Sequence, residues 1–170
     1  MRIWILLLAV LLSGCTGLPD KVTPVKSFET ERYLGTWYEI ARLDHSFEKD
    51  LEQVTAEYQL REDGGIRVVN RGVDKKSGEH KKAEGKAYFV DNADEAHLKV
   101  SFFGPFYSSY VVFELGDDYQ YAFVAGYNHD YLWLLSRTPT VSPELKKQFV
   151  EKSNQLGFST EDLIWVNQSK

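Results

Sequence analysis

Cysteine is nearly absent from this sequence. Cys15 is the only cysteine among 170 residues, so the chain cannot form an internal disulfide. The four histidines are scattered without the spacing of metal ligands, and no serine stands in the pattern of a nucleophile elbow. We therefore predict no catalytic residue, no metal site and no cofactor. One alternative stays open, because His129 and Asp130 could form a base and its orienting partner instead of a solvated loop pair.

Clusters of basic residues are also missing. The formal net charge is −5 at pH 7, and lysine and arginine are spread along the chain. An acidic chain of this kind lacks the electrostatic footprint of a nucleic-acid-binding protein. We therefore expect no nucleic-acid partner. The length is suitable for one domain.

A long apolar run occurs only at the N-terminus. Residues 3–12 are almost all apolar and lead into the sequence Leu-Ser-Gly-Cys at residues 12–15. The run is too short to span a bilayer but has the length of a secretory signal. Its end resembles the lipobox of bacterial lipoproteins, in which the cysteine is acylated and becomes the new N-terminus. The alternative is an incidental thiol behind an ordinary signal peptide.

The lipobox resemblance divides the chain into three parts. We predict a signal peptide over residues 1–14, a lipidated N-terminus and tether over residues 15–27, and a folded domain over residues 28–170. Acyl chains on Cys15 would anchor the protein to a membrane permanently. Thr16, rather than an aspartate, follows this cysteine. In enterobacteria-like sorting this favours the outer membrane, with the domain facing the periplasm.

Short segments of alternating apolar and polar residues follow one another along the middle of the chain. Ala56 and Tyr58, for example, share one face of a segment, while Glu57 and Gln59 share the other. Turn residues such as those at 63–65 separate the segments. The predicted strands are Thr36–Leu43, Val54–Arg61, Ile66–Arg71, Glu84–Val90, His97–Phe103, Tyr110–Leu115, Tyr119–Gly126 and Tyr131–Arg137.

One helix is predicted after these strands. Ser142 is a suitable N-cap, Pro143 fits the first helical position and Gly157 fits the C-terminal end. A short final strand is expected over Leu163–Val166. Eight strands without a helical crossover connect as antiparallel hairpins, and closing them leaves no free edge. The predicted fold is therefore all-β, an eight-stranded antiparallel up-and-down β-barrel with one C-terminal α-helix packed outside.

Several motifs occur in order along this pattern. Gly35-Thr36-Trp37 begins the first strand, Asp117-Asp118-Tyr119 precedes the seventh, and Arg137 ends the eighth. The series resembles the lipocalin family, in its bacterial and apolipoprotein D-like branch, over nearly all of residues 28–168. In that family a tryptophan–arginine pair closes one end of the barrel. Strand direction also lets Trp37 and Arg137 meet, so we assign Gly35, Trp37 and Arg137 to structure.

Strand alternation also predicts the wall of the barrel lumen. Charged positions are placed outside, and their neighbours then point inside. Asn70 is the most informative inward residue, because a buried amide costs stability unless something bonds it. The predicted ligand-binding residues, some of which the resemblance also implies, are Tyr58, Asn70, Ala87, Val100, Phe102, Tyr110, Val112 and Trp133. The other inward positions are Ala56, Leu60, Val68, Leu98 and Tyr131, for several of which a plain structural core is the alternative.

The resemblance implies a binding protein and not an enzyme. We expect a fatty acid or a lysophospholipid in the lumen, held for storage or transport at the cell envelope. The tyrosines and Asn70 favour an amphiphile over a purely apolar guest. The alternatives are an envelope interaction protein with a filled barrel and a lipid-modifying enzyme. The aromatic loop at residues 104–109 suggests a lid over the pocket, or a contact with membrane, ligand or a second copy in a homodimer.

Overall fold

The computed structural model describes residues 15–169, so the predicted signal peptide lies outside the described residues. Within this range nine strands form one antiparallel sheet, which is closed because β1 pairs with β2 as well as with β8. The elements in chain order are α1 Thr30–Tyr33, β1 Gly35–Arg42, β2 Leu51–Leu60, β3 Ile66–Asp74, β4 His80–Phe89, β5 His97–Phe103, β6 Phe106–Leu115, β7 Tyr121–Ala125, β8 Leu132–Ser136, α2 Pro143–Gln155, the 3₁₀ turn η1 Thr160–Asp162 and β9 Ile164–Trp165.

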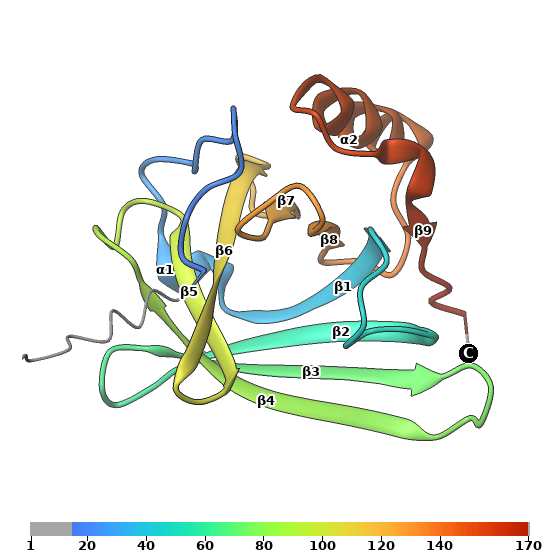
Figure 1. The fold of residues 1–170 in the computed structure, drawn as a ribbon, viewed down its shortest axis with the longest axis horizontal. Helices are drawn as coiled ribbons and strands as arrows, with labels where there is room; N and C mark the ends of the chain where they lie inside the picture. The colour runs from blue at the N-terminus through green and yellow to red at the C-terminus, as the bar shows by residue number, and fades with distance from the viewer. Residues whose placement is uncertain (1–14, 170) are drawn as a thin grey trace, which may run out of the picture.

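The predicted fold class is confirmed. Strands β1 to β8 form an up-and-down barrel, β9 adds a short ninth strand on β1, and α2 lies on the outside (Figure 1). The four-residue helix α1, which covers one end of the barrel, was not predicted. A single turn of helix has too few residues to show a hydrophobic period.

Helix α2 forms where its capping residues predict it. The Ser142 hydroxyl accepts a hydrogen bond from the Leu145 amide at 3.2 Å, with proline at the first helical position. Phe149 on α2 is fully buried, and its ring lies 5.0 Å from that of Phe123 on β7. The helix was predicted to pack outside the barrel, and Phe149 shares an apolar core with Leu132 on β8. Within residues 15–169 no helix is both long and apolar enough to cross a membrane.

One end of the barrel is closed by Arg137. Its guanidinium lies 3.9 Å from the ring centre of Trp37 and donates to the carbonyls of Thr36 and Arg32 at 3.0 and 2.8 Å. Gly35 has a φ of 93°, which a side chain would strain, and a Cβ there would lie 3.4 Å from Arg137. The predicted meeting of the tryptophan and the arginine is therefore confirmed, and we call this the closed end.

The opposite, open end carries the connections after β1, β3, β5 and β7, because neighbouring strands are antiparallel. Several strands continue further toward this end than predicted: β2 begins at Leu51 and β3 ends at Asp74. The predicted loop at residues 104–109 is wrong for its last four residues. Phe106 pairs with Phe103 and begins β6, so only Gly104 and Pro105 form the turn.

Leu60 was expected inside the barrel and is instead 53% exposed. It occupies the last position of β2 and pairs only with Ile66 on β3. β1 covers β2 only as far as Tyr58, so Leu60 extends past the wall of the barrel. Alternation predicted the correct face of β2 for Leu60, but β1 does not extend far enough to cover this residue.

Residues 15–27, the expected tether, lie along the outside of the barrel. Cys15 forms a parallel bridge with Ser108 on β6, and its carbonyl accepts a hydrogen bond from the Ser109 amide at 2.8 Å. Further on, Val25 donates to Val112 on β6 at 2.9 Å. The segment is therefore docked against β6 over this length instead of standing free.

Replacing Arg137 by methionine should lower the free energy of unfolding by about 2–3 kcal/mol, because three hydrogen bonds to carbonyls and the stacking on Trp37 are lost. Urea unfolding followed by circular dichroism measures the change. Arg61→Met, at the exposed turn after β2, is the matched control and should leave the midpoint almost unchanged. Equal losses in the two variants would show that Arg137 has no special part in closing the barrel.

Candidate functional site

The barrel encloses a cavity of about 690 Å³ between the closed and open ends. This volume is within the usual range for sites that hold small molecules. Most of the surface that faces the cavity is apolar. Seven of the eight predicted ligand-binding residues border it: Tyr58, Asn70, Ala87, Val100, Phe102, Tyr110 and Trp133. The structure thus brings together residues from β2, β3, β4, β5, β6 and β8.

Val112 is the predicted wall residue that does not border the cavity. It points inward, as expected, but is fully buried in the apolar core that also contains Trp37. Its register partner on β7, Val124, borders the cavity instead. Alternation shows which way a side chain points, whereas its depth along the barrel decides whether it meets the cavity or the core.

Three tyrosines meet near the closed end of the cavity. The hydroxyl of Tyr110 lies 2.7 Å from that of Tyr33 and 2.9 Å from that of Tyr58. Burial raises the pKa of each of these phenols above its ordinary value, so all three are neutral at physiological pH. The group is polar but satisfies its own hydrogen bonds, which makes it a stable end wall for an apolar chain.

Asn70 on β3 is polar and faces the cavity, and its side-chain oxygen makes no hydrogen bond. Its side-chain oxygen Oδ1 is buried and has no hydrogen-bond partner within residues 15–169. The residues paired with it in register are Ala56 on β2 and Ala83 on β4, and both border the cavity. Two small side chains therefore flank the amide, and Asn70 borders the cavity. An unbonded buried carbonyl oxygen is costly, and a ligand donor would satisfy it.

A buried ionic cluster lies toward the open end of the cavity. The Arg42 guanidinium donates to Glu39 at 2.7 Å and to the main-chain carbonyls of Glu48 and Leu51 at 2.8 and 3.2 Å. Arg42 is only 1% exposed, and both glutamates are buried. These bonds hold the segment between β1 and β2 against the barrel.

The second carboxylate of the cluster is held by an imidazole and an indole. Glu48 Oε2 lies 2.8 Å from His45 Nε2 and accepts a hydrogen bond from Trp133 at 3.0 Å. Burial by itself would raise the pKa of Glu48, but His45, Trp133 and Arg42 outweigh it and keep the pKa below its ordinary value. Burial raises the pKa of Glu39 well above its ordinary value, and Glu48 adds to that increase although Arg42 opposes it. The cluster therefore has one carboxylate held ionised and one that tends to keep its proton.

Both glutamates border the cavity, although neither was predicted to do so. Placing every charged residue outside is wrong for Glu39, because Arg42 supplies a buried partner. A usable signal was present: Glu39 is two residues after Trp37 on the same strand, so alternation from that tryptophan places it inside. No comparable pattern exists for Glu48, which lies between strands.

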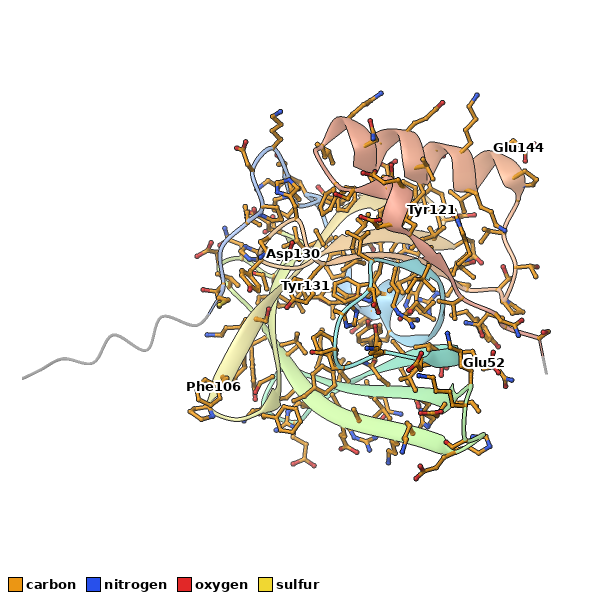
Figure 2. The ribbon with its side chains drawn as sticks, turned by 45° about the vertical axis from the view of Figure 1, so that its right-hand side comes forward. Glu52, Phe106, Tyr121, Asp130, Tyr131 and Glu144 are labelled. Carbon is orange, nitrogen blue, oxygen red and sulfur yellow. The ribbon has the colours of Figure 1, made fainter. Side chains whose placement is uncertain are left out.

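Aromatic rings surround the open end. The Phe47 and Tyr131 rings stack with their centres 6.1 Å apart, and Tyr131 also stacks on Trp133 at 6.2 Å. Tyr131 was predicted to face the interior, and it borders the cavity close to Asp130 (Figure 2). Large apolar rings at an opening can contact a long ligand as it enters.

The residues considered for catalysis do not form a catalytic arrangement. His129 Nε2 lies 2.9 Å from the Leu156 carbonyl, while the Asp130 carboxylate accepts a hydrogen bond from Asn128 at 2.9 Å. The suggested base and orienting partner are thus bonded elsewhere. Across residues 15–169 no group of three or more histidine, cysteine, aspartate or glutamate residues is placed to hold a metal ion.

The barrel, the Trp37–Arg137 pair that closes it and the apolar cavity together define a class of protein. Residues 28–168 match the lipocalin-like domain family. The chain therefore belongs to the lipocalin family, whose members bind small molecules and are not enzymes as a class.

Three related proteins and one solved structure are similar to this chain. The chain is 60% identical over 98% of its length to the outer membrane lipoprotein Blc of Vibrio cholerae, of which 98% is covered. It is 52% identical to the protein of the same name from Escherichia coli, over 88% of this chain and 85% of that one. Rat apolipoprotein D is 34% identical over 70% of this chain and 66% of its own length. Among solved structures, insecticyanin from Manduca sexta has the same fold, with a TM-score of 0.72 at 20% identity, covering 91% of this chain and 88% of that one.

Glu39→Gln should change how stability depends on pH. With a raised folded pKa, native Glu39 keeps its proton above pH 4.5, its ordinary value, where the unfolded chain releases it. Wild-type stability therefore falls as pH rises from that value toward the folded pKa, and the variant should lack this decline. Urea unfolding at a series of pH values measures it.

Glu57→Gln provides the control for this pH series. Arg71 holds the pKa of Glu57 below its ordinary value, so that ionised glutamate stabilises the fold above pH 4.5 and the benefit is lost as pH falls. The two variants should therefore deviate from the wild type in opposite directions. Parallel profiles for the wild type and Glu39→Gln would contradict the assignment of Glu39.

Asn70→Leu should raise the stability of the ligand-free protein by about 1 kcal/mol, since it removes an unbonded oxygen with little change in volume. The same variant should bind an amphiphile more weakly. Unfolding in urea and a ligand titration measure the two effects. Asn92→Leu, at the exposed turn after β4, should give no such gain. A destabilised Asn70→Leu would mean that the amide already makes a bond that contributes to the fold.

Proposed function

We propose that this lipocalin holds a single amphiphile, a fatty acid or a lysophospholipid, in its barrel for storage or transport. The observation that carries the proposal is the cavity of about 690 Å³, whose wall is mostly apolar and contains the unbonded amide of Asn70. A filled barrel that serves only as a scaffold has no need for such a space. The oxygen of that amide can only accept a hydrogen bond, so it favours a guest with a hydroxyl or N–H donor, as a lysophospholipid has and an ionised fatty acid lacks.

The acyl chain of the ligand fits best toward the closed end. There Val68, Ala87 and Leu98 surround the cavity, and the tyrosine hydroxyls satisfy one another. An acyl chain needs no hydrogen bonds, so it suits a wall that offers none. The burial of apolar surface, worth about 25 cal/mol per Å², would supply most of the affinity.

The head group fits best at the open end. Lys49, Lys81 and Lys82 border the cavity there, and they suit the carboxylate of a fatty acid or the phosphate of a lysophospholipid. The proposed pose is therefore chain inward and head outward, close to the lysines.

We further propose that the protein is anchored in the outer membrane through acyl chains on Cys15, with its barrel in the periplasm. Two relatives, 60% and 52% identical to this chain over the aligned residues, are named outer membrane lipoproteins. Cys15 is exposed, as an acylated residue must be. An anchored carrier would meet lipid ligands at a high local concentration. Whether two copies associate remains a prediction from the sequence.

Ala83→Trp should weaken amphiphile binding at least roughly tenfold, which corresponds to about 1.4 kcal/mol. The new indole would fill the space beside Asn70 without disturbing the closed end, because Ala83 lies on β4 and borders the cavity. Titration with a fluorescent long-chain fatty acid and with a lysophospholipid measures the affinity. Mass spectrometry of the natively extracted protein identifies what the cell supplies.

Lys86→Trp is the matched control, with the same indole placed on the outer face of β4. It should bind as the wild type does. If wild-type protein carries no lipid on extraction and shows no saturable titration, the binding function is wrong and the scaffold alternative is favoured. If both tryptophan variants bind normally, the ligand site lies outside the barrel.

A further inference from the structure

We propose that the open end of the barrel rests on the bilayer, with Phe47, Phe103 and Phe106 as its contact surface. This inference rests on the proposed acylation of Cys15 and adds an orientation for the whole domain. The bound partner is the phospholipid surface that carries the acyl chains. The cavity would then open toward lipid and not toward water.

The three phenylalanines are unusually exposed for their size. Phe103 is 80% exposed, Phe106 is 71% exposed and Phe47 is 61% exposed. Phe103 and Phe106 flank the turn of the β5–β6 hairpin, and Phe106 lies at its tip, far from the helix that carries Glu144 (Figure 2). All three border the opening of the cavity. Exposed aromatic side chains gathered at one end of a protein are typical of an interaction surface.

The position of Cys15 brings the anchor to the same end. Its bridge to Ser108 places it two residues along β6 from Phe106, roughly 7 Å at the usual rise of a strand. The bridge is parallel, so the chain runs from Cys15 along β6 away from the open end. It bonds to Val112 further along β6 and continues to α1 at the closed end. Acyl chains on Cys15 would thus begin beside the exposed phenylalanines.

The charges at the two ends of the barrel also favour contact of the open end, and not of the closed end, with the bilayer. The turns of the closed end are acidic: against the single base Arg61, those after β2, β4 and β6 contain Glu62, Asp63, Asp91, Asp94, Glu95, Asp117 and Asp118. The connections of the open end are less acidic. They combine Lys49, Lys75 and Lys76 with Asp44, Glu48, Asp50, Glu79 and Asp130, and Asp50 pairs with both Lys75 and Lys76. Anionic head groups would repel the closed end more strongly than the open one. Within residues 15–169, Leu60 is the only large apolar side chain that is exposed at a strand end of the closed end.

This orientation has a direct consequence for ligand exchange. A lysophospholipid or fatty acid could move between bilayer and cavity past Phe47, Phe103 and Phe106 without its chain crossing bulk water. Removing three phenylalanine side chains from water stabilises the contact with the bilayer modestly. The acyl anchor keeps the domain at the membrane, so this contact persists. The barrel would act at the surface to which it is attached.

The test places an environment-sensitive fluorophore at each end of the full chain. Phe106→Cys and Glu62→Cys are produced separately, acylated at Cys15 as the mass of the N-terminal peptide verifies, and reconstituted in vesicles of phosphatidylethanolamine and phosphatidylglycerol. We expect lipid-borne nitroxide to quench the probe at 106 several-fold more than the probe at 62. Aqueous iodide should show the opposite preference. Unlabelled protein should show slower amide exchange at residues 103–106 on vesicles than in solution.

Each outcome has a distinct meaning. Equal iodide quenching at both positions in acylated protein, or lipid quenching at 62 alone, overturns the orientation and leaves the ligand proposal intact. Shielding of 106 from iodide without lipid quenching indicates a second copy of the chain at this surface and also overturns it. A missing acyl mass contradicts the proposed anchor itself. Loss of ligand binding is read separately from the titrations, so it does not bear on the orientation.

Discussion

Arg137 connects three separate segments of the chain at the closed end of the barrel. Its guanidinium stacks on Trp37 and donates hydrogen bonds to the carbonyl of Arg32, before β1, and to that of Thr36, within β1. It also donates to the Tyr119 carbonyl, in the turn that precedes β7. Because the first and last strands of the barrel meet there, the seam of the sheet is held by a charged group that bonds to main-chain oxygens. Everything above this seam, including the cavity, depends on the barrel being closed. This is why the motif residues belong to structure, whereas the proposed ligand-binding residues line the cavity.

The polar groups of the interior occur in three places with different states of bonding. The tyrosines near the closed end satisfy one another, and the cluster of Glu39, Arg42 and Glu48 near the open end is nearly complete. Between them, the oxygen of Asn70 has no partner within the described chain. A barrel core built only for stability would exclude this residue, since a leucine would cost less. The placement is therefore consistent with selection for a guest over selection for the empty fold.

Much of this architecture could be predicted because it depends on local periods. Two-residue alternation and turn residues predicted eight strands, and the capping residues predicted α2 and its outer face. Depth was harder to predict: Leu60 and Val112 have the expected strand face, but their exposure is set by neighbouring strands that lie far away in sequence. Buried charge was the other failure. Alternation from Trp37 places Glu39 inside, but the Arg42 partner that permits its burial meets it across a β-bulge, which a single sequence does not show.

The way Arg42 holds the segment between β1 and β2 has a consequence for variation among related proteins. Two of its hydrogen bonds go to main-chain carbonyls, those of Glu48 and Leu51, which every residue type possesses. Side chains along that segment can therefore change without loosening its attachment to the barrel. The shape and chemistry of the opening could diversify while the scaffold below stays constant. In this respect the opening resembles the variable loops of binding proteins that recognise many guests on one framework.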